Sequence, residues 1–147
     1  MRLINNLLLA ALLAVSSSAF AAGSLEATVY KDPSCGCCGK YISYLQANGF
    51  KVNAVDADDL ELIKNAHHIP FPMRSCHTML IDGYVVEGHV PVAAIHKLLD
   101  SHPKIAGIAL PGMPATSPGM GPEQPGSLTV YVLGNDDAAK PAVFSVE

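Results

Sequence analysis

The chain has 147 residues, which is room for one domain, and half of them are hydrophobic, which is enough for a packed core. Its formal net charge at pH 7 is −4, and its nine lysines and arginines form no cluster. A protein that binds nucleic acid gathers such residues against the phosphates, so the sequence excludes nucleic acid as a partner.

The first residues have the pattern of a secretory signal. In MRLINNLLLAALLAVSSSAFAA, Arg2 precedes an apolar stretch from Leu7 to Val15, and small residues follow around Ala21. The apolar stretch is too short for a membrane span, which takes about 20 apolar residues. The sequence therefore predicts a signal peptide over residues 1–21, export, and no membrane span in the mature protein.

Strand and helix patterns alternate after the signal. The predicted elements are a strand at 26–32, a helix at 40–50, a strand at 51–57, a helix within 56–69, two strands at 77–81 and 84–87, and a helix within 90–103. Asp82-Gly83 between the last two strands is a hairpin signal. The order β-α-β-α-β-β-α predicts an α/β, thioredoxin-like domain whose first two strands are parallel.

The composition changes after Pro103. Residues 105–127 hold much of the proline and glycine and predict a loop without regular structure. The segments LTVYVL (128–133) and AVFSV (142–146) predict two closing strands. The expected organisation is a signal peptide at 1–21, a thioredoxin-like metal-binding domain at 25–120, and a C-terminal extension with two short strands at 121–147.

The cysteines of the chain form an unusual group. The segment DPSCGCCGK carries Cys35, Cys37 and Cys38 just before a helix that we expect to begin near Gly39, and Cys76 precedes the third strand. A thioredoxin-like topology places that strand start beside the N-terminus of the first helix, so the four thiols are expected to meet. An even cysteine count in an exported chain often indicates a disulfide framework, but here three of the four share one loop.

Clustered thiols indicate a soft metal. Thiolates and thioethers select Cu(I), zinc or iron–sulfur clusters. Structural zinc is usually held by two separated ligand pairs, whereas here one ligand-rich loop meets a single distant cysteine. Iron–sulfur clusters are usually assembled in reducing compartments. Export, soft donors and nearby methionines therefore favour copper.

Three further residues are candidate ligands. His89 lies in Gly88-His89-Val90-Pro91, and Met113 and Met120 lie in the Pro/Gly-rich loop. His89 could instead orient the loop, and the methionines could instead fill gaps in packing. His77 adjoins Cys76, but neighbours on a strand point to opposite faces, so we expect it in the core or on the surface.

Two other functions are compatible with the cysteines. Cys35 and Cys38 form a C-x-x-C pair ahead of a helix, the arrangement of thiol–disulfide oxidoreductases, although Cys37 between them would disturb a two-thiol exchange. The second alternative function is that of a passive metallochaperone, which delivers copper without changing its oxidation state.

Four segments resemble, in order, the CopG family of bacterial periplasmic copper-resistance proteins, long known as a domain of unknown function. They are VYKDPSCGCCGKY, MRSCHT, GYVVEGHVP and LPGMPATSPGM, and the likeness covers about residues 28–120. The resemblance implies a thioredoxin-like fold in which Cys35, Cys37, Cys38 and Cys76 bridge several copper ions in a multinuclear Cu(I) cluster that can change oxidation state.

The resemblance also implies a role. The protein would be periplasmic and would act in copper resistance, either by interconverting Cu(I) and Cu(II) as a copper oxidoreductase or by transferring copper to other periplasmic copper-handling proteins. The cysteines show no departure from the family's pattern, and the residues beyond Gly121 are not covered by it.

Overall fold

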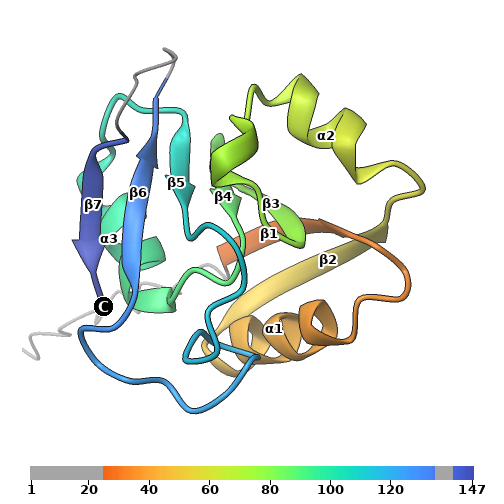
Figure 1. The fold of residues 1–147 in the computed structure, drawn as a ribbon, viewed down its shortest axis with the longest axis horizontal. Coiled ribbons are helices and arrows are strands. Elements are labelled where there is room, and N and C mark those ends of the chain that lie inside the picture. The colour runs from red at the N-terminus through yellow and green to blue at the C-terminus, as the bar shows by residue number, and fades with distance from the viewer. Residues whose placement is uncertain (1–24, 135–140) are drawn as a thin grey trace, which may run out of the picture.

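The computed structural model describes residues 25–134 and 141–147, which form a seven-stranded mixed sheet and three helices (Figure 1). The predicted signal peptide lies outside these residues. Within the described ranges, no helix combines the length and the apolar character that crossing a membrane requires. The elements in chain order are β1 (Leu25–Lys31), α1 (Gly36–Ala47), β2 (Phe50–Asp56), α2 (Leu60–Ala66), the 3-10 turn η1 (Phe71–Met73), β3 (His77–Ile81), β4 (Tyr84–Glu87), α3 (Val92–Ser101), β5 (Gly107–Ala109), β6 (Thr129–Leu133) and β7 (Val143–Val146).

The first four strands and the three helices have the predicted thioredoxin-like order. The sheet runs β2-β1-β3-β4-β5-β6-β7, with β1 parallel to β2 and antiparallel to β3. Strands β3 and β4 have the predicted bounds and form the predicted hairpin. Asp82 and Gly83 have φ angles of 47° and 79°, the left-handed conformation that a tight two-residue hairpin turn requires.

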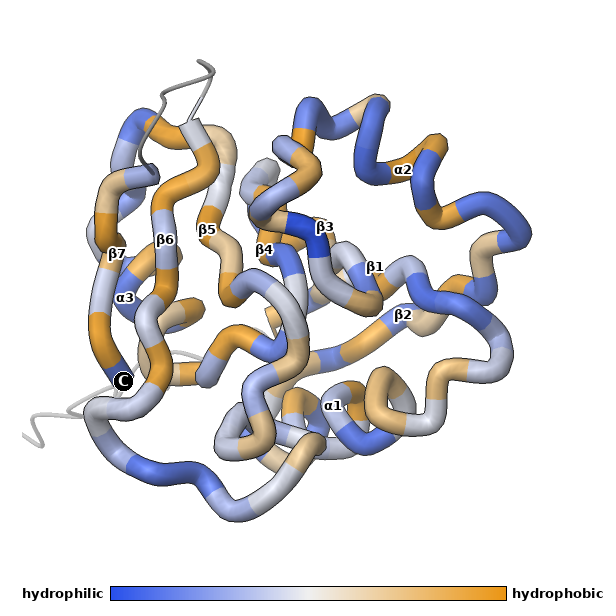
Figure 2. The backbone as a smooth tube through the Cα atoms, viewed as in Figure 1, coloured by the Kyte–Doolittle hydropathy of each residue, from blue (hydrophilic) through white to orange (hydrophobic). Residues whose placement is uncertain are grey.

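Side chains alternate between two core clusters on the two faces of the sheet. Val86 packs in one cluster with the buried faces of α1 and α3, whereas its neighbour Val85 packs in the other with Ile69, which follows α2. Figure 2 shows hydrophobic stretches in β5 and β6 and alternating colours along α1 and α2, as expected of helices buried on one side only. The sheet is therefore covered on both faces where it approaches the cysteines.

One prediction was wrong in the segment after α3. Residues 107–109, expected to be irregular, form β5, which pairs in parallel with β4 and antiparallel with β6. Three residues are too few to show a period, and the strand exists because Ile108 is buried in the core between its neighbours. Residues 110–127 lack helix and strand, as predicted, and β6 and β7 join the same continuous sheet.

We expect Gly107→Ala to destabilise the protein by about 3 kcal/mol, because the added Cβ would lie 1.8 Å from the Val85 carbonyl oxygen and push β5 away from β4. Gly39→Ala is the matched control. Its Cβ would meet nothing within 4 Å, and alanine in a helix gains up to about 1 kcal/mol over glycine. Urea unfolding measures both, and equal stabilities of the two variants would contradict the close pairing of β5 with β4.

Candidate metal centre

The loop between β1 and α1 fixes the first three cysteines. Asp32 Oδ1 accepts hydrogen bonds from the backbone N–H and the hydroxyl of Ser34, and the Cys35 N–H donates to the Asp32 carbonyl at 3.0 Å. Helix α1 begins at Gly36 rather than near Gly39. Cys35 is its N-cap, and its sulfur accepts the N–H of Cys38 at 3.3 Å. The predicted start was three residues too late, because cysteine is not one of the usual N-cap residues.

The pairing of β1 with β3 brings Cys76 to this loop. Lys31 at the end of β1 is opposite His77 at the start of β3, so the residues just beyond each strand end meet. The Cys37 sulfur lies 3.4 Å from that of Cys35 and 3.9 Å from that of Cys76. All four sulfurs lie within 4.8 Å of one another, which is the convergence that the topology predicted. Metal binding by them stays a prediction.

A disulfide joins two of the four cysteines. Cys35 and Cys38 are bonded, with their Cα atoms 5.4 Å apart, while Cys37 and Cys76 are free thiols. The cysteine spacing in the sequence did not favour a disulfide framework, because such frameworks connect distant loops and three of these cysteines share one loop. This bond is local: a C-x-x-C pair at a helix N-terminus brings the two Cα atoms into the normal range for a disulfide. The described structure is thus the oxidised form of this pair.

His89 is directed at Cys76 in one defined tautomer. Its Nδ1 lies 2.6 Å from the Pro118 carbonyl oxygen, which can only accept, so Nδ1 carries the proton. Its Nε2 therefore presents a lone pair, and it lies 3.0 Å from the Cys76 sulfur. Burial lowers the pKa of His89, which keeps the ring neutral. Fixing one ring nitrogen by a backbone carbonyl is how proteins orient metal-binding histidines.

His77 is buried beside the same sulfur. Its Nδ1 lies 3.5 Å from the Cys76 sulfur, its ring packs against Tyr41, and its Nε2 has no hydrogen-bond partner within the described part of the chain. The alternation rule suggested that His77 and Cys76 would face apart. Cys76 precedes β3, so strict alternation does not apply to the pair. Cys76, His77 and His89 form a second group of donors within 4.8 Å.

Burial lowers the pKa of His77 to about 3, with His89 and Lys64 adding to the effect. Because unfolded histidine has a pKa of about 6.5, the neutral ring favours the folded state above pH 6.5, and this contribution is lost as the pH falls from 6.5 towards 3. In this window, each decrease of one pH unit should lower the free energy of unfolding of metal-free wild-type protein. The decrease should exceed that of the His77→Leu variant by up to about 1.4 kcal/mol. Urea unfolding from pH 7 to pH 4 tests this, and parallel curves for the two proteins would refute it.

The two candidate methionines lie in a loop that is tied to the centre. The Ser75 hydroxyl donates to the Gly112 carbonyl at 2.5 Å, beside Met113, and His89 binds Pro118, two residues before Met120. Both methionine side chains are partly exposed, at 54% for Met113 and 37% for Met120. Both thioethers are thus accessible from solvent, and their ligation stays a prediction.

A buried ion pair, missed in the sequence, holds the residue before Cys76. The Glu87 carboxylate accepts hydrogen bonds from Lys64 Nζ at 2.5 Å, from the Thr78 hydroxyl at 2.7 Å and from the Ser75 N–H at 2.7 Å. Lys64 and Glu87 are 2% and 0% exposed. The sequence signal for this ion pair was Glu87, a charged residue at the end of the apolar strand YVVE. The network fixes the backbone that carries the fourth cysteine.

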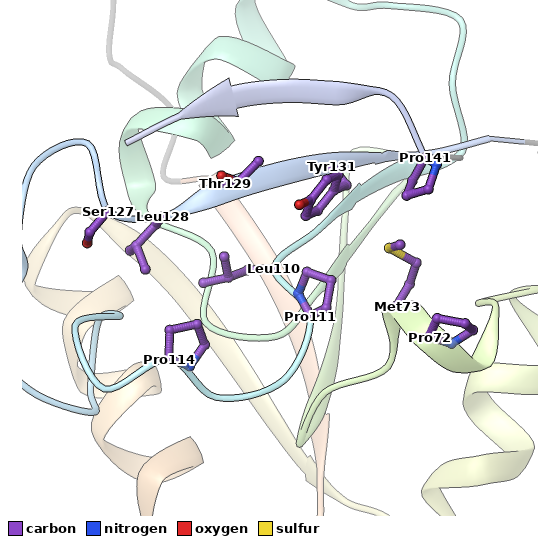
Figure 3. Close-up of a pocket in the computed structure, with 10 residues that line it drawn as sticks. All are labelled: Pro72, Met73, Leu110, Pro111, Pro114, Ser127, Leu128, Thr129, Tyr131 and Pro141. Atoms are coloured by element: carbon purple, nitrogen blue, oxygen red, sulfur yellow. The ribbon is translucent and has the colours of Figure 1, made fainter. Parts of the chain in front are cut away.

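A separate groove of about 640 Å³ lies between the η1 turn, β6 and the segment after β5 (Figure 3). Its lining is mainly apolar and proline-rich, with Met73 and Tyr131 facing it, and it includes no cysteine or histidine. The four cysteines therefore lie outside this groove, at the N-terminus of α1.

Comparisons with known proteins give a consistent result. The family described as "Protein of unknown function, DUF411" matches residues 73–120, which include Cys76, His77 and His89. No curated protein matches the chain. Two solved structures, titled "Copper resistance protein copG- Form 2" and "Copper resistance protein copG- Form 1", are each 39% identical to this chain with a TM-score of 0.73. Each match covers 84% of this chain and 98% of the other.

Proposed function

This chain belongs to the CopG family of copper resistance proteins, and on that premise we propose that it binds copper at Cys35, Cys37, Cys38 and Cys76 as a cysteine-bridged, multinuclear Cu(I) cluster. The observation that carries the proposal is the convergence of four sulfurs within 4.8 Å. Four donors so close together can each bridge two ions. Thiolate and imidazole donors favour Cu(I) over harder ions.

The electrostatics of the centre favour the binding of several cations together. Burial raises the pKa of Cys76 to about 12, and the neighbouring Cys37 thiol adds to the rise. Four thiolates at this spacing repel one another, so they can all ionise only when cations neutralise them. Copper binding is then coupled to the release of thiol protons, and it needs the Cys35–Cys38 bond to be reduced first.

The proposed setting is the periplasm, reached by means of the signal peptide. There the protein would contribute to copper resistance, either by interconverting Cu(I) and Cu(II) or by transferring copper to other copper-handling proteins. His89, Met113 and Met120 are proposed as accessory ligands, since His89 presents Nε2 to the centre and the loop of the methionines is tied to it.

The test is the copper content of reduced protein. The chain is reduced, freed of reductant without oxygen, loaded with Cu(I), desalted, and analysed for copper per chain. We expect more than one copper per chain, and clearly less in protein that keeps its disulfide. A content of one copper or less in the fully reduced protein would contradict a multinuclear cluster.

A thiol–disulfide oxidoreductase is the second candidate, favoured by the disulfide at the N-terminus of α1. Such enzymes place the attacking cysteine at that position, where the helix dipole stabilises its thiolate. An insulin-reduction assay on metal-free protein decides between the two functions. Rapid turnover that copper abolishes would support the oxidoreductase, and absence of turnover would leave copper binding as the function.

A further inference from the structure

One segment of the Pro/Gly-rich loop is buried beside the cysteines. Ser117 and Pro118 are buried, whereas most of residues 110–127 are partly or fully exposed. The Pro118 carbonyl oxygen lies 2.6 Å from His89 Nδ1. The segment SPGM, residues 117–120, thus supplies the hydrogen-bond acceptor that decides which nitrogen of His89 keeps its proton.

This segment has the features of a type II β-turn. The Met120 N–H donates to the Ser117 carbonyl at 3.0 Å. Pro118 occupies the second position of the turn, and Gly119 occupies the third with a φ of 81°. A type II turn differs from a type I turn by a flip of its central peptide group, which here carries the Pro118 carbonyl. The positive φ of Gly119 therefore sets the direction in which that carbonyl points.

Gly119 also lets the turn lie directly on α1. A Cβ added at Gly119 would lie 2.8 Å from the Tyr41 backbone nitrogen, so a larger residue would push the turn away from the helix. Because α1 also carries Cys37 and Cys38, the turn and these two cysteines share one support. The position of the carbonyl relative to the sulfurs is thereby fixed.

We propose that Gly119 is a positioning residue for copper binding, because its turn holds the proton of His89 on Nδ1 and leaves Nε2, 3.0 Å from the Cys76 sulfur, with a free lone pair. A neutral histidine can carry its proton on either ring nitrogen. With the proton on Nε2, the ring would donate to the sulfur and could not bind a metal ion there. The inference rests on the proposed function, since it takes copper to bind at Cys76.

The tautomer of His89 can be measured without metal. The full chain, with its disulfide intact and its histidines isotope-labelled, is studied at pH 7 by long-range proton–nitrogen NMR correlation, which distinguishes a protonated ring nitrogen from one with a lone pair. The His89→Asn variant identifies the His89 signals by their absence. We expect one tautomer of His89, with the proton on Nδ1. A proton on Nε2, or a mixture of both tautomers, would overturn the inference even if no variant of Gly119 folds.

Gly119→Ala should release His89 from this tautomer. We expect signals of both tautomers, because the added Cβ displaces the turn and its carbonyl. The Cu(I) affinity of the reduced protein, measured by competition with a chelator, should fall roughly 10- to 100-fold, as when a metal ligand loses its outer-shell partner. A His89 spectrum and a Cu(I) affinity equal to those of the wild type would refute the role of Gly119.

Gly126→Ala is the matched control. Gly126 is the third residue of a second Pro-Gly turn in the same loop, where the Ser127 N–H donates to the Gln124 carbonyl at 3.1 Å and the φ of Gly126 is 76°. Its Cβ would meet nothing within 4 Å, so alanine brings the same backbone strain without a clash. We expect the wild-type tautomer and affinity. A loss equal to that of Gly119→Ala would mean that general loosening of the loop is the cause, and would overturn the inference.

Copper loading separates the two proposals. If the reduced wild type holds more than one copper and Gly119→Ala binds copper with unchanged affinity, the inference alone fails. If the tautomer depends on Gly119 but the reduced wild type holds one copper or less, the multinuclear cluster fails and the control of His89 by the turn stands.

Discussion

Cys76→Ser is expected to abolish multinuclear copper binding while leaving the fold intact. Cys76 is the one cysteine of the four that lies outside the loop, and its sulfur lies next to Cys37, His77 and His89. Without this sulfur, no donor connects the thiols of the loop with the two histidines. Since losing even an outer-shell partner lowers metal affinity about 10- to 100-fold, we expect the loss of this donor to lower Cu(I) affinity by roughly 100-fold or more.

Competition with a Cu(I) chelator and metal analysis measure this effect. His96→Ala is the control, because His96 is an exposed, potentially copper-binding side chain on α3 that packs near Phe50 rather than at the centre. Its copper content and affinity should equal those of the wild type. A Cys76→Ser protein that holds as much copper as the wild type would refute the role of the fourth sulfur.

The largest loss of stability is expected from Lys64→Met. The substitution leaves the Glu87 carboxylate, which is 0% exposed, without its cation, and burial already raises the pKa of Glu87 with Lys64 in place. Breaking a buried pair from one side costs about 3–5 kcal/mol. The double variant Lys64→Met/Glu87→Gln should recover most of the loss, because the neutral amide oxygen can still accept the Ser75 N–H.

The exposed pair of Lys51 and Glu26 offers a control of the same chemistry. These side chains are 70% and 69% exposed, so Lys51→Met should cost less than about 1 kcal/mol. Urea unfolding of metal-free protein measures all the variants. Equal effects of Lys64→Met and Lys51→Met would show that the buried network does not hold the Cys76 segment in place.

Much of the fold was predictable because its signals are local and strong. The hairpin of β3 and β4 was confirmed at both bounds, since Asp82-Gly83 separates two apolar runs. The meeting of Cys76 with the first three cysteines followed from topology alone. These features depend on chain order and turn chemistry, which can be read from one sequence.

The features that were missed depend on contacts between distant residues. Strand β5 is too short to show a period, and it exists because β4 and β6 bind it on both sides. The pairing of Lys64 with Glu87 joins residues 23 positions apart on a helix and a strand. The position of His77 at the centre depends on where β3 begins, which decides whether alternation separates it from Cys76.

The most direct test of the proposed copper centre is X-ray absorption at the copper edge on reduced protein loaded anaerobically with Cu(I). The four converging sulfurs predict a coordination shell made mainly of sulfur, together with scattering from a second copper ion, and both signals should weaken in Cys37→Ser. A shell made mainly of nitrogen and oxygen, with no copper neighbour, would contradict a cysteine-bridged cluster.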